Sequence, residues 1–119
     1  MLQDPETSGR PVDAPGPGAR PLGSSAIVSV EFEVFGQVQG VYFTKYCRDK
    51  SLELGLSGWV KNSKRGTILG KMQGEKRYVE QMIQWLSKVG SPGCRIDRCD
   101  LINLEYLRRQ EFRGFTIRF

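Results

Sequence analysis

The feature that most constrains the fold is a change in apolar spacing across a short glycine-containing loop. From Ile27 onward, apolar and polar residues alternate, with apolar side chains at Val28, Val30, Phe32 and Val34. This period of two predicts a strand with one buried face. The loop from Gly36 to Tyr42 follows, and the next stretch, which Gly55 ends, has the spacing of a helix as far as Leu54. The sequence therefore predicts a strand that runs through a tight loop directly into a helix.

The remainder of the chain continues this pattern. Residues 56–61 and 67–73 are predicted as two strands joined by a polar turn, residues 75–89 as a helix, and residues 95–104 and 112–118 as two final strands. The order is β-α-β-β-α-β with one extra strand segment. It predicts an α+β fold, the ferredoxin-like split βαβ sandwich, with an antiparallel sheet and both helices on one face.

Length and composition indicate one folded domain behind a tail. The chain has 119 residues, and residues 1–25 hold five of the six prolines and no aromatic residue. Such a stretch buries too little apolar surface to offset the entropy of ordering it. We therefore expect a disordered Pro/Gly-rich tail over residues 1–25 and a folded domain over residues 26–119.

The composition also limits where the protein works. No apolar stretch is long enough to cross a bilayer, and the first residues include Asp4 and Glu6 rather than a hydrophobic block. Three cysteines, an odd number without close paired spacing, do not form a disulfide framework. These observations predict a cytoplasmic protein that has no membrane partner, and a monomer is the plain expectation.

The absence of histidine narrows the chemistry that this chain can perform. With no histidine and three scattered cysteines, His-based acid–base catalysis is excluded and a metal site is not expected. The net charge is +5, and because residues 1–25 sum to −1, the rest of the chain carries +6. A basic domain attracts anions, whether nucleic acid, anionic membrane or phosphorylated small molecules. We expect no metal and no cofactor.

The loop before the first helix has the properties of an anion cradle. Free N–H groups at a helix start, next to a concave loop that glycine permits, favour phosphate, and residues 41–43 offer no capping oxygen. A plain strand–helix turn explains the same residues equally well on physical grounds alone. The candidate phosphate-binding residues are Gly36, Gln37, Val38, Gln39, Gly40, Val41 and Tyr42.

A second segment resembles a known family. The run Gly58–Asn62, followed by Gly66-Thr67-Ile68 and Gly74, is similar to the second signature of acylphosphatases, and the loop from Gly36 to Phe43 resembles the first. Shorter runs at residues 91–92, 95–97 and 115–118 are similar to muscle-type members. The resemblance covers residues 26–119 and implies hydrolysis of acyl phosphates to carboxylate and phosphate without metal or cofactor. The implied small-molecule partner is an acyl phosphate or inorganic phosphate.

The resemblance also implies roles for particular residues. Loop amides hold the phosphoryl oxygens, an arginine at the start of the first helix clamps them, and an asparagine orients the attacking water. Asn62 matches the asparagine, although asparagine is also common where a strand ends in a turn. Thr44 stands at the arginine position. Threonine offers neither a guanidinium fork nor a charge, and as a good N-cap it is expected to satisfy the helix-start amides.

Two hypotheses for function follow from Thr44. One is an acylphosphatase-type hydrolase, active or impaired; impairment is expected because losing one transition-state donor costs about 10²–10³ in rate. The other is an inactive relative that binds phosphate or a protein partner. Arg48, one helical turn after Thr44, is a candidate substitute for the arginine, with a solvated surface arginine as the alternative.

RNA binding is a third class, because RNA-recognition domains share the predicted architecture and this domain is basic. Arg113-Gly114-Phe115 matches the opening of the RNP1 motif, but Thr116 stands where glycine or alanine belongs. Phe115 is therefore interpreted as a core residue, and no nucleic-acid partner is expected.

Overall fold

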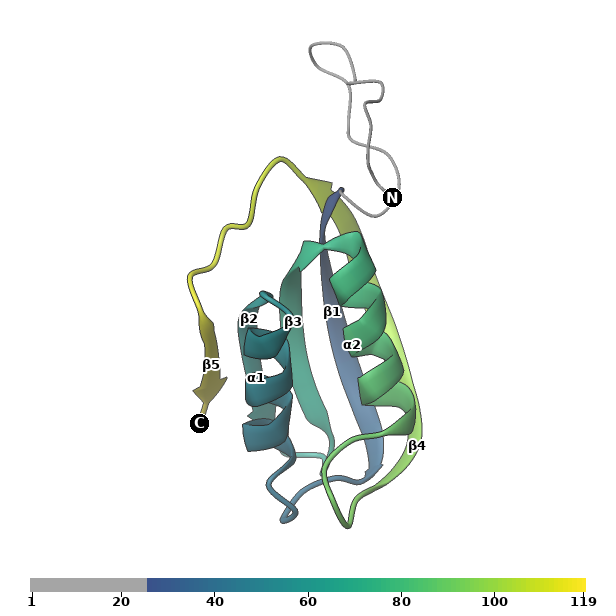
Figure 1. Ribbon diagram of the computed structural model, residues 1–119. Coiled ribbons are helices and arrows are strands. Elements are labelled where there is room, and N and C mark those ends of the chain that lie inside the picture. Colours follow the sequence, from purple (N-terminus) through teal and green to yellow (C-terminus); the bar gives the residue numbers. More distant parts are fainter. Residues whose placement is uncertain (1–25) are drawn as a thin grey trace.

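The computed structural model describes residues 26–119, which form one five-stranded sheet and two helices (Figure 1). The predicted element types and their order are confirmed, whereas the predicted tail lies outside the described residues. The elements are β1 (Ile27–Gln37), α1 (Phe43–Glu53), β2 (Ser57–Asn62), β3 (Ile68–Glu75), α2 (Lys76–Lys88), β4 (Arg95–Leu107) and β5 (Phe115–Arg118).

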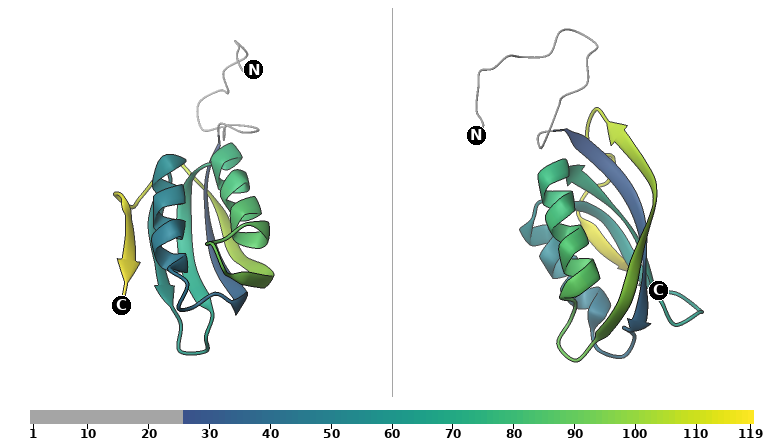
Figure 2. Two further views of the ribbon diagram at one scale, coloured as in Figure 1. Left: turned by 60° about the horizontal axis from the view of Figure 1, so that its bottom comes forward. Right: turned by 90° about the vertical axis from the view of Figure 1, so that its right-hand side faces the viewer.

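The strands lie in the order β4-β1-β3-β2-β5, and both helices cover the same face of the sheet (Figure 2). Strand β1 pairs antiparallel with both β3 and β4, and β2 pairs antiparallel with β3. Strand β5, however, runs parallel to β2. The sheet is therefore mixed, and the prediction of a purely antiparallel sheet is wrong on this point.

The parallel pair follows from the path of the chain after β4. The connection from β4 to β5 passes to the opposite edge of the sheet without changing ends, so β5 runs back against the direction of β4 (Figure 1). Strand β2 also runs against β4, because β3 shares the direction of β4 and is antiparallel to β2. A strand added beside β2 by this connection is necessarily parallel to it.

The core lies between the sheet and the helices. The four predicted apolar residues of β1 are at most 1% exposed, and α2 buries Val79, Met82 and Leu86 against them. Helix α1 buries Phe43, Cys47 and Ser51, while Tyr46 is 40% exposed. Burial raises the pKa of the Cys47 thiol well above its usual range, so this cysteine is a packing residue. Neither helix combines the length and apolar character needed to span a bilayer.

A buried glutamine attaches the connection between β4 and β5 to the uncovered face of the sheet. Gln73 is 0% exposed, and its Nε2 donates to Ser29 Oγ and to Glu111 Oε1, at 3.3 Å each. Its Oε1 accepts from the Glu111 backbone N–H at 2.7 Å. Ser57 Oγ donates to Gln110 Oε1 nearby, at 2.6 Å. Side chains of two strands thus hold one end of the connection in place.

Replacing Gln73 with leucine is expected to destabilise the fold. Gln73→Leu leaves the Glu111 N–H and Ser29 without their partner, which costs about 1–3 kcal/mol in the free energy of unfolding. The exposed Gln84 on α2 is the matched control, and Gln84→Leu should change stability by less than about 0.5 kcal/mol. Urea denaturation followed by tryptophan fluorescence measures both, and equal effects would contradict the structural role of Gln73.

Candidate functional site

The loop between β1 and α1 starts where β1 is pressed against β4. Gly36 has φ +142°, and a Cβ at this position would lie 2.0 Å from the backbone oxygen of Arg95. Strand β1 stays paired with β4 as far as Gln37, which lies opposite Arg95. A register shift between Phe35 and Gly36 precedes this last part of the pairing. Only glycine permits this approach, so Gly36 sets the point at which the loop leaves the sheet.

Helix α1 begins without a side-chain cap. Its N-cap is Tyr42, in the left-handed conformation at φ 57°, and no side chain hydrogen-bonds to the helix start. The first turn contains no acidic residue. The N–H groups of this turn have no carbonyl partner within the helix, so they favour an anion at the helix start.

Thr44 is not the cap of this helix, and the prediction that it satisfies the helix-start amides is wrong. Tyr42 occupies the N-cap position, and the first helical bond runs from the Tyr46 N–H to the Tyr42 carbonyl at 3.1 Å. Thr44 therefore lies inside the first turn, two residues beyond the position where a hydroxyl caps a helix. The amides at the start of α1 therefore have no side-chain cap.

Gln39 ties the loop to the turn that follows Asn62. Its Nε2 donates to the backbone carbonyls of Ser63 and Thr67, at 2.9 Å each. Asn62 ends β2 and is exposed directly before this turn. The loop and Asn62, which belong to different strand ends, are thus brought together by one side chain. No local pattern in the sequence indicates this contact of the Gln39 side chain.

A hydrogen-bond network holds the turn itself. Ser63 Oγ accepts from the backbone N–H groups of Arg65 and Thr67, and its hydroxyl bonds to Thr67 Oγ1. Thr67 Oγ1 and Arg65 both donate to the Glu33 carboxylate on β1. These hydrogen bonds give the turn that follows Asn62 a defined shape.

The cations of the first two turns of α1 are bound to one carboxylate. Lys45 Nζ lies 3.2 Å from Asp49 Oδ2, and Arg48 donates to Asp49 Oδ1 through Nε and Nη2 at 3.3 and 3.2 Å. The hydrogen bond from Lys45, supported by Arg48, lowers the pKa of Asp49. Arg48 is thus paired on the surface of the helix, as the alternative interpretation of this residue expects.

The remaining loop residues contribute through their backbone. Val38 is 1% exposed and packs in the core, and Val41 packs against it, whereas Gln37 and Gly40 are exposed. Across residues 26–119 no three Cys, Asp or Glu side chains gather in a way that would hold a metal ion. The candidate site therefore comprises backbone amides, Asn62 and the bridge made by Gln39.

Comparison with known proteins identifies the family. The acylphosphatase family model matches residues 30–117. The chain belongs to the acylphosphatase family. It is 45% identical over 96 residues to Acylphosphatase-2 of Homo sapiens, covering 81% of this chain and 97% of that protein. Identity to Acylphosphatase-2 of Meleagris gallopavo is 47% over 96 residues, covering 81% and 93%. The resemblance inferred from the two signatures is confirmed.

Solved structures of bacterial acylphosphatases share the fold of this chain. An acylphosphatase from Coxiella burnetii matches with a TM-score of 0.68 and 30% identity, covering 78% of this chain and 94% of that one. One from Bacillus subtilis matches with a TM-score of 0.67 and 25% identity, covering 77% and 99%. The ferredoxin-like fold predicted from the sequence is confirmed by these neighbours.

Two glycines of the loop allow its geometry to be tested. In Gly36→Ala the new methyl group collides with the Arg95 carbonyl, whereas at Gly40, φ +78°, no atom lies within 4 Å of the position that a methyl group would take. Gly40→Ala therefore costs only backbone strain, about 1 kcal/mol, while Gly36→Ala should cost more than about 3 kcal/mol. Chemical denaturation measures both variants. Equal losses would show that β1 is not held against β4 at Gly36.

Proposed function

We propose that the loop of residues 36–42 and the start of α1 bind the phosphoryl group of an acyl phosphate. Asn62 orients the water that attacks phosphorus, and the products are a carboxylate and inorganic phosphate. The observation that carries this proposal is the start of α1, which has no side-chain cap and no acidic residue in its first turn. A dianionic phosphoryl group supplies the acceptors that these amides lack.

The reaction suits a site without histidine. A carboxylate is a good leaving group, so no general acid is needed, and catalysis rests on positioning and charge stabilisation. Gln39 joins the amides that hold the phosphoryl group to the turn beside Asn62. We propose that this bridge keeps the water-orienting group at a fixed distance from phosphorus.

Hydrolysis by this chain is proposed to be impaired. The family resemblance places an arginine at Thr44, and the basic side chains nearest along the helix, Lys45 and Arg48, are both engaged by Asp49. The negative charge that develops on the equatorial oxygens of the phosphoryl group in the transition state is then stabilised by backbone amides but by no guanidinium group. Loss of one such donor lowers the rate by about 10²–10³.

A second candidate function is phosphate binding without turnover, or a protein-interaction role for the same surface. The only feature that favours this function is Thr44. The helix-start amides bind a ground-state phosphate without an arginine, whereas efficient turnover needs one. In both cases we propose a cytoplasmic monomer that needs no metal or cofactor.

Restoring the arginine distinguishes these functions. Thr44→Arg is expected to raise kcat for metal-free hydrolysis of benzoyl phosphate by about 10²–10³. Thr44→Lys is the control, because lysine supplies a positive charge without the bidentate guanidinium group. Its kcat should rise less than that of Thr44→Arg. Arg48→Ala should leave the wild-type rate unchanged. An active wild type that Arg48→Ala inactivates would mean that Arg48 replaces the family arginine, against the proposal. No gain in Thr44→Arg would mean that the amides do not hold a reacting phosphoryl group.

The bridge made by Gln39 gives a separate prediction. Gln39→Ala removes two hydrogen bonds between the loop and the turn, and binding of inorganic phosphate should weaken about tenfold, the equivalent of ~1.4 kcal/mol. Gln37→Ala is the matched control, because Gln37 is an exposed glutamine of the same loop. Phosphate titration followed by NMR measures both dissociation constants. Equal effects of the two variants would remove the positioning role of Gln39.

A further inference from the structure

The face of the sheet away from the helices carries a row of cations beside a tryptophan. Strand pairing places Trp59 opposite Lys71 on β3 and Thr116 on β5, and Lys61 opposite Arg118. Residues that pair directly across strands point to the same face. Their sequence neighbours Val60, Met72 and Phe115 are in the core, so this set lies on the uncovered face.

These cations contact aromatic rings instead of carboxylates. The Arg118 guanidinium carbon lies 4.5 Å from the centre of the Trp59 ring, and Lys61 Nζ lies 5.9 Å from it. Lys71 Nζ lies 5.9 Å from the centre of the Phe112 ring, which the connection from β4 to β5 brings over the same face. Phe112 and Trp59 thus offer flat apolar surface between positive charges.

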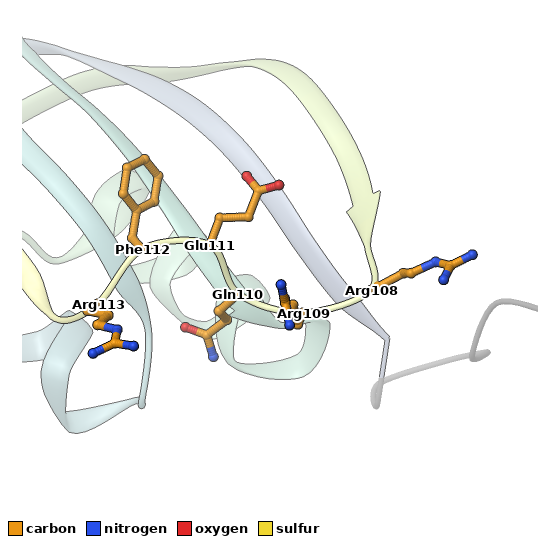
Figure 3. A pocket seen from close by; sticks show the side chains of 6 residues that line it. All are labelled: Arg108, Arg109, Gln110, Glu111, Phe112 and Arg113. Atoms are coloured by element: carbon orange, nitrogen blue, oxygen red, sulfur yellow. The ribbon is translucent and has the colours of Figure 1, made fainter.

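The connection adds three more arginines. A cavity of about 680 Å³ is lined by Arg108, Arg109, Gln110, Glu111, Phe112 and Arg113 (Figure 3). The one acidic group among them, Glu111, is hydrogen-bonded by Gln73. The three arginines are carried on the stretch of chain between the end of β4 and β5 (Figure 3).

The distribution of ion pairs separates the arginines of this surface from the other arginines of the described chain. The arginines on the helices, on β4 and in the turn between β2 and β3 pair with carboxylates, as do two lysines of α1; these residues are Arg48, Arg65, Arg77, Arg95, Arg98, Lys45 and Lys50. Within residues 26–119, four arginines have no carboxylate partner, and all four belong to this surface: Arg108, Arg109, Arg113 and Arg118. Two acidic residues of β1 also lie on this face, and Glu31 is directly opposite Lys71. Glu31 accepts a hydrogen bond from Asn103, and Glu33 accepts hydrogen bonds from Arg65 and Thr67.

We propose that this surface binds single-stranded nucleic acid. The surface, here called the basic face, consists of Trp59, Lys61, Lys71, Phe112 and Arg118 with Arg108, Arg109 and Arg113. Its cations suit a chain of phosphates, and its rings suit unstacked bases, which stack on aromatic side chains and on guanidinium planes. A duplex keeps its bases stacked inside, and the acidic side chains of a peptide supply negative charge but no ring to stack on Trp59.

The expectation of no nucleic-acid partner rested on one motif of the last strand, and that motif remains excluded. Phe115 is 5% exposed and packs in the core, so it offers no ring to a base. The basic face instead uses outward residues of three strands and the connection, which are distant in sequence. The proposal does not depend on acyl phosphate hydrolysis, since none of these residues belongs to the phosphate loop.

The test is fluorescence anisotropy of a labelled twelve-nucleotide oligouridine at low salt. Wild type should bind the oligonucleotide. The logarithm of its association constant should fall linearly with the logarithm of the salt concentration, with a slope of about −0.7 per phosphate contacted. Lys71→Gln with Arg118→Gln should weaken binding at least about tenfold, and Trp59→Leu about fivefold or more. The control, Lys76→Gln with Lys88→Gln, removes the same charge from two α2 lysines that form no ion pair within residues 26–119. It should change binding less than about twofold.

Four outcomes would overturn the proposal. These are no binding by wild type, equal loss in the two double variants, no effect of Trp59→Leu, and equal displacement by polyglutamate or by anionic vesicles. Unfolding curves of each variant exclude loss of fold as the cause. Phosphate titration of the Lys71→Gln/Arg118→Gln protein should be unchanged, so failure of the basic face is distinguishable from failure of the phosphate loop.

Discussion

The pairing of β1 on both of its edges is the constraint on which the rest of the structure depends. Strand β1 pairs with β3 and with β4, and its four apolar residues form the centre of the core. Because the end of β1 is pressed against Arg95 at Gly36, the loop leaves the sheet at a fixed point. The loop then enters α1 through Tyr42 in the left-handed conformation. An uncapped helix start therefore results from strand pairing, and Gln39 joins it to the end of β2.

Much of the fold was predictable because local patterns and burial agree. The alternation in β1 and the helical spacing of α2 are strong signals, and both elements are found where the sequence places them. The direction of β5 was not predictable from the periodicity of its four residues. It depends on which edge of the sheet the connection reaches, and that is decided by contacts such as those of Gln73 and Ser57 with the connection.

The site was predictable only as far as its motifs reach. The loop and Asn62 follow from two signatures that stand in the correct order. The contact of Gln39 with Ser63 and Thr67 joins residues 24 and 28 positions apart, and no local pattern indicates it. The error about Thr44 has a simple cause: the sequence shows a capping residue near the helix start, but the cap position depends on the backbone angles of Tyr42. Arg48 has an adjacent Asp49, and that neighbour was the signal for a surface ion pair.

We propose that the start of α1 binds phosphate although Thr44 stands where the family resemblance implies an arginine. The most direct measurement is a ¹⁵N–¹H NMR titration of the full chain with inorganic phosphate. We expect saturable chemical-shift changes concentrated in the backbone amides of residues 38–44, weaker changes with sulfate and none with chloride. Shifts confined to other parts of the chain, or no saturation, would contradict the proposal, because the amides at this helix start would then have no affinity for the phosphoryl group.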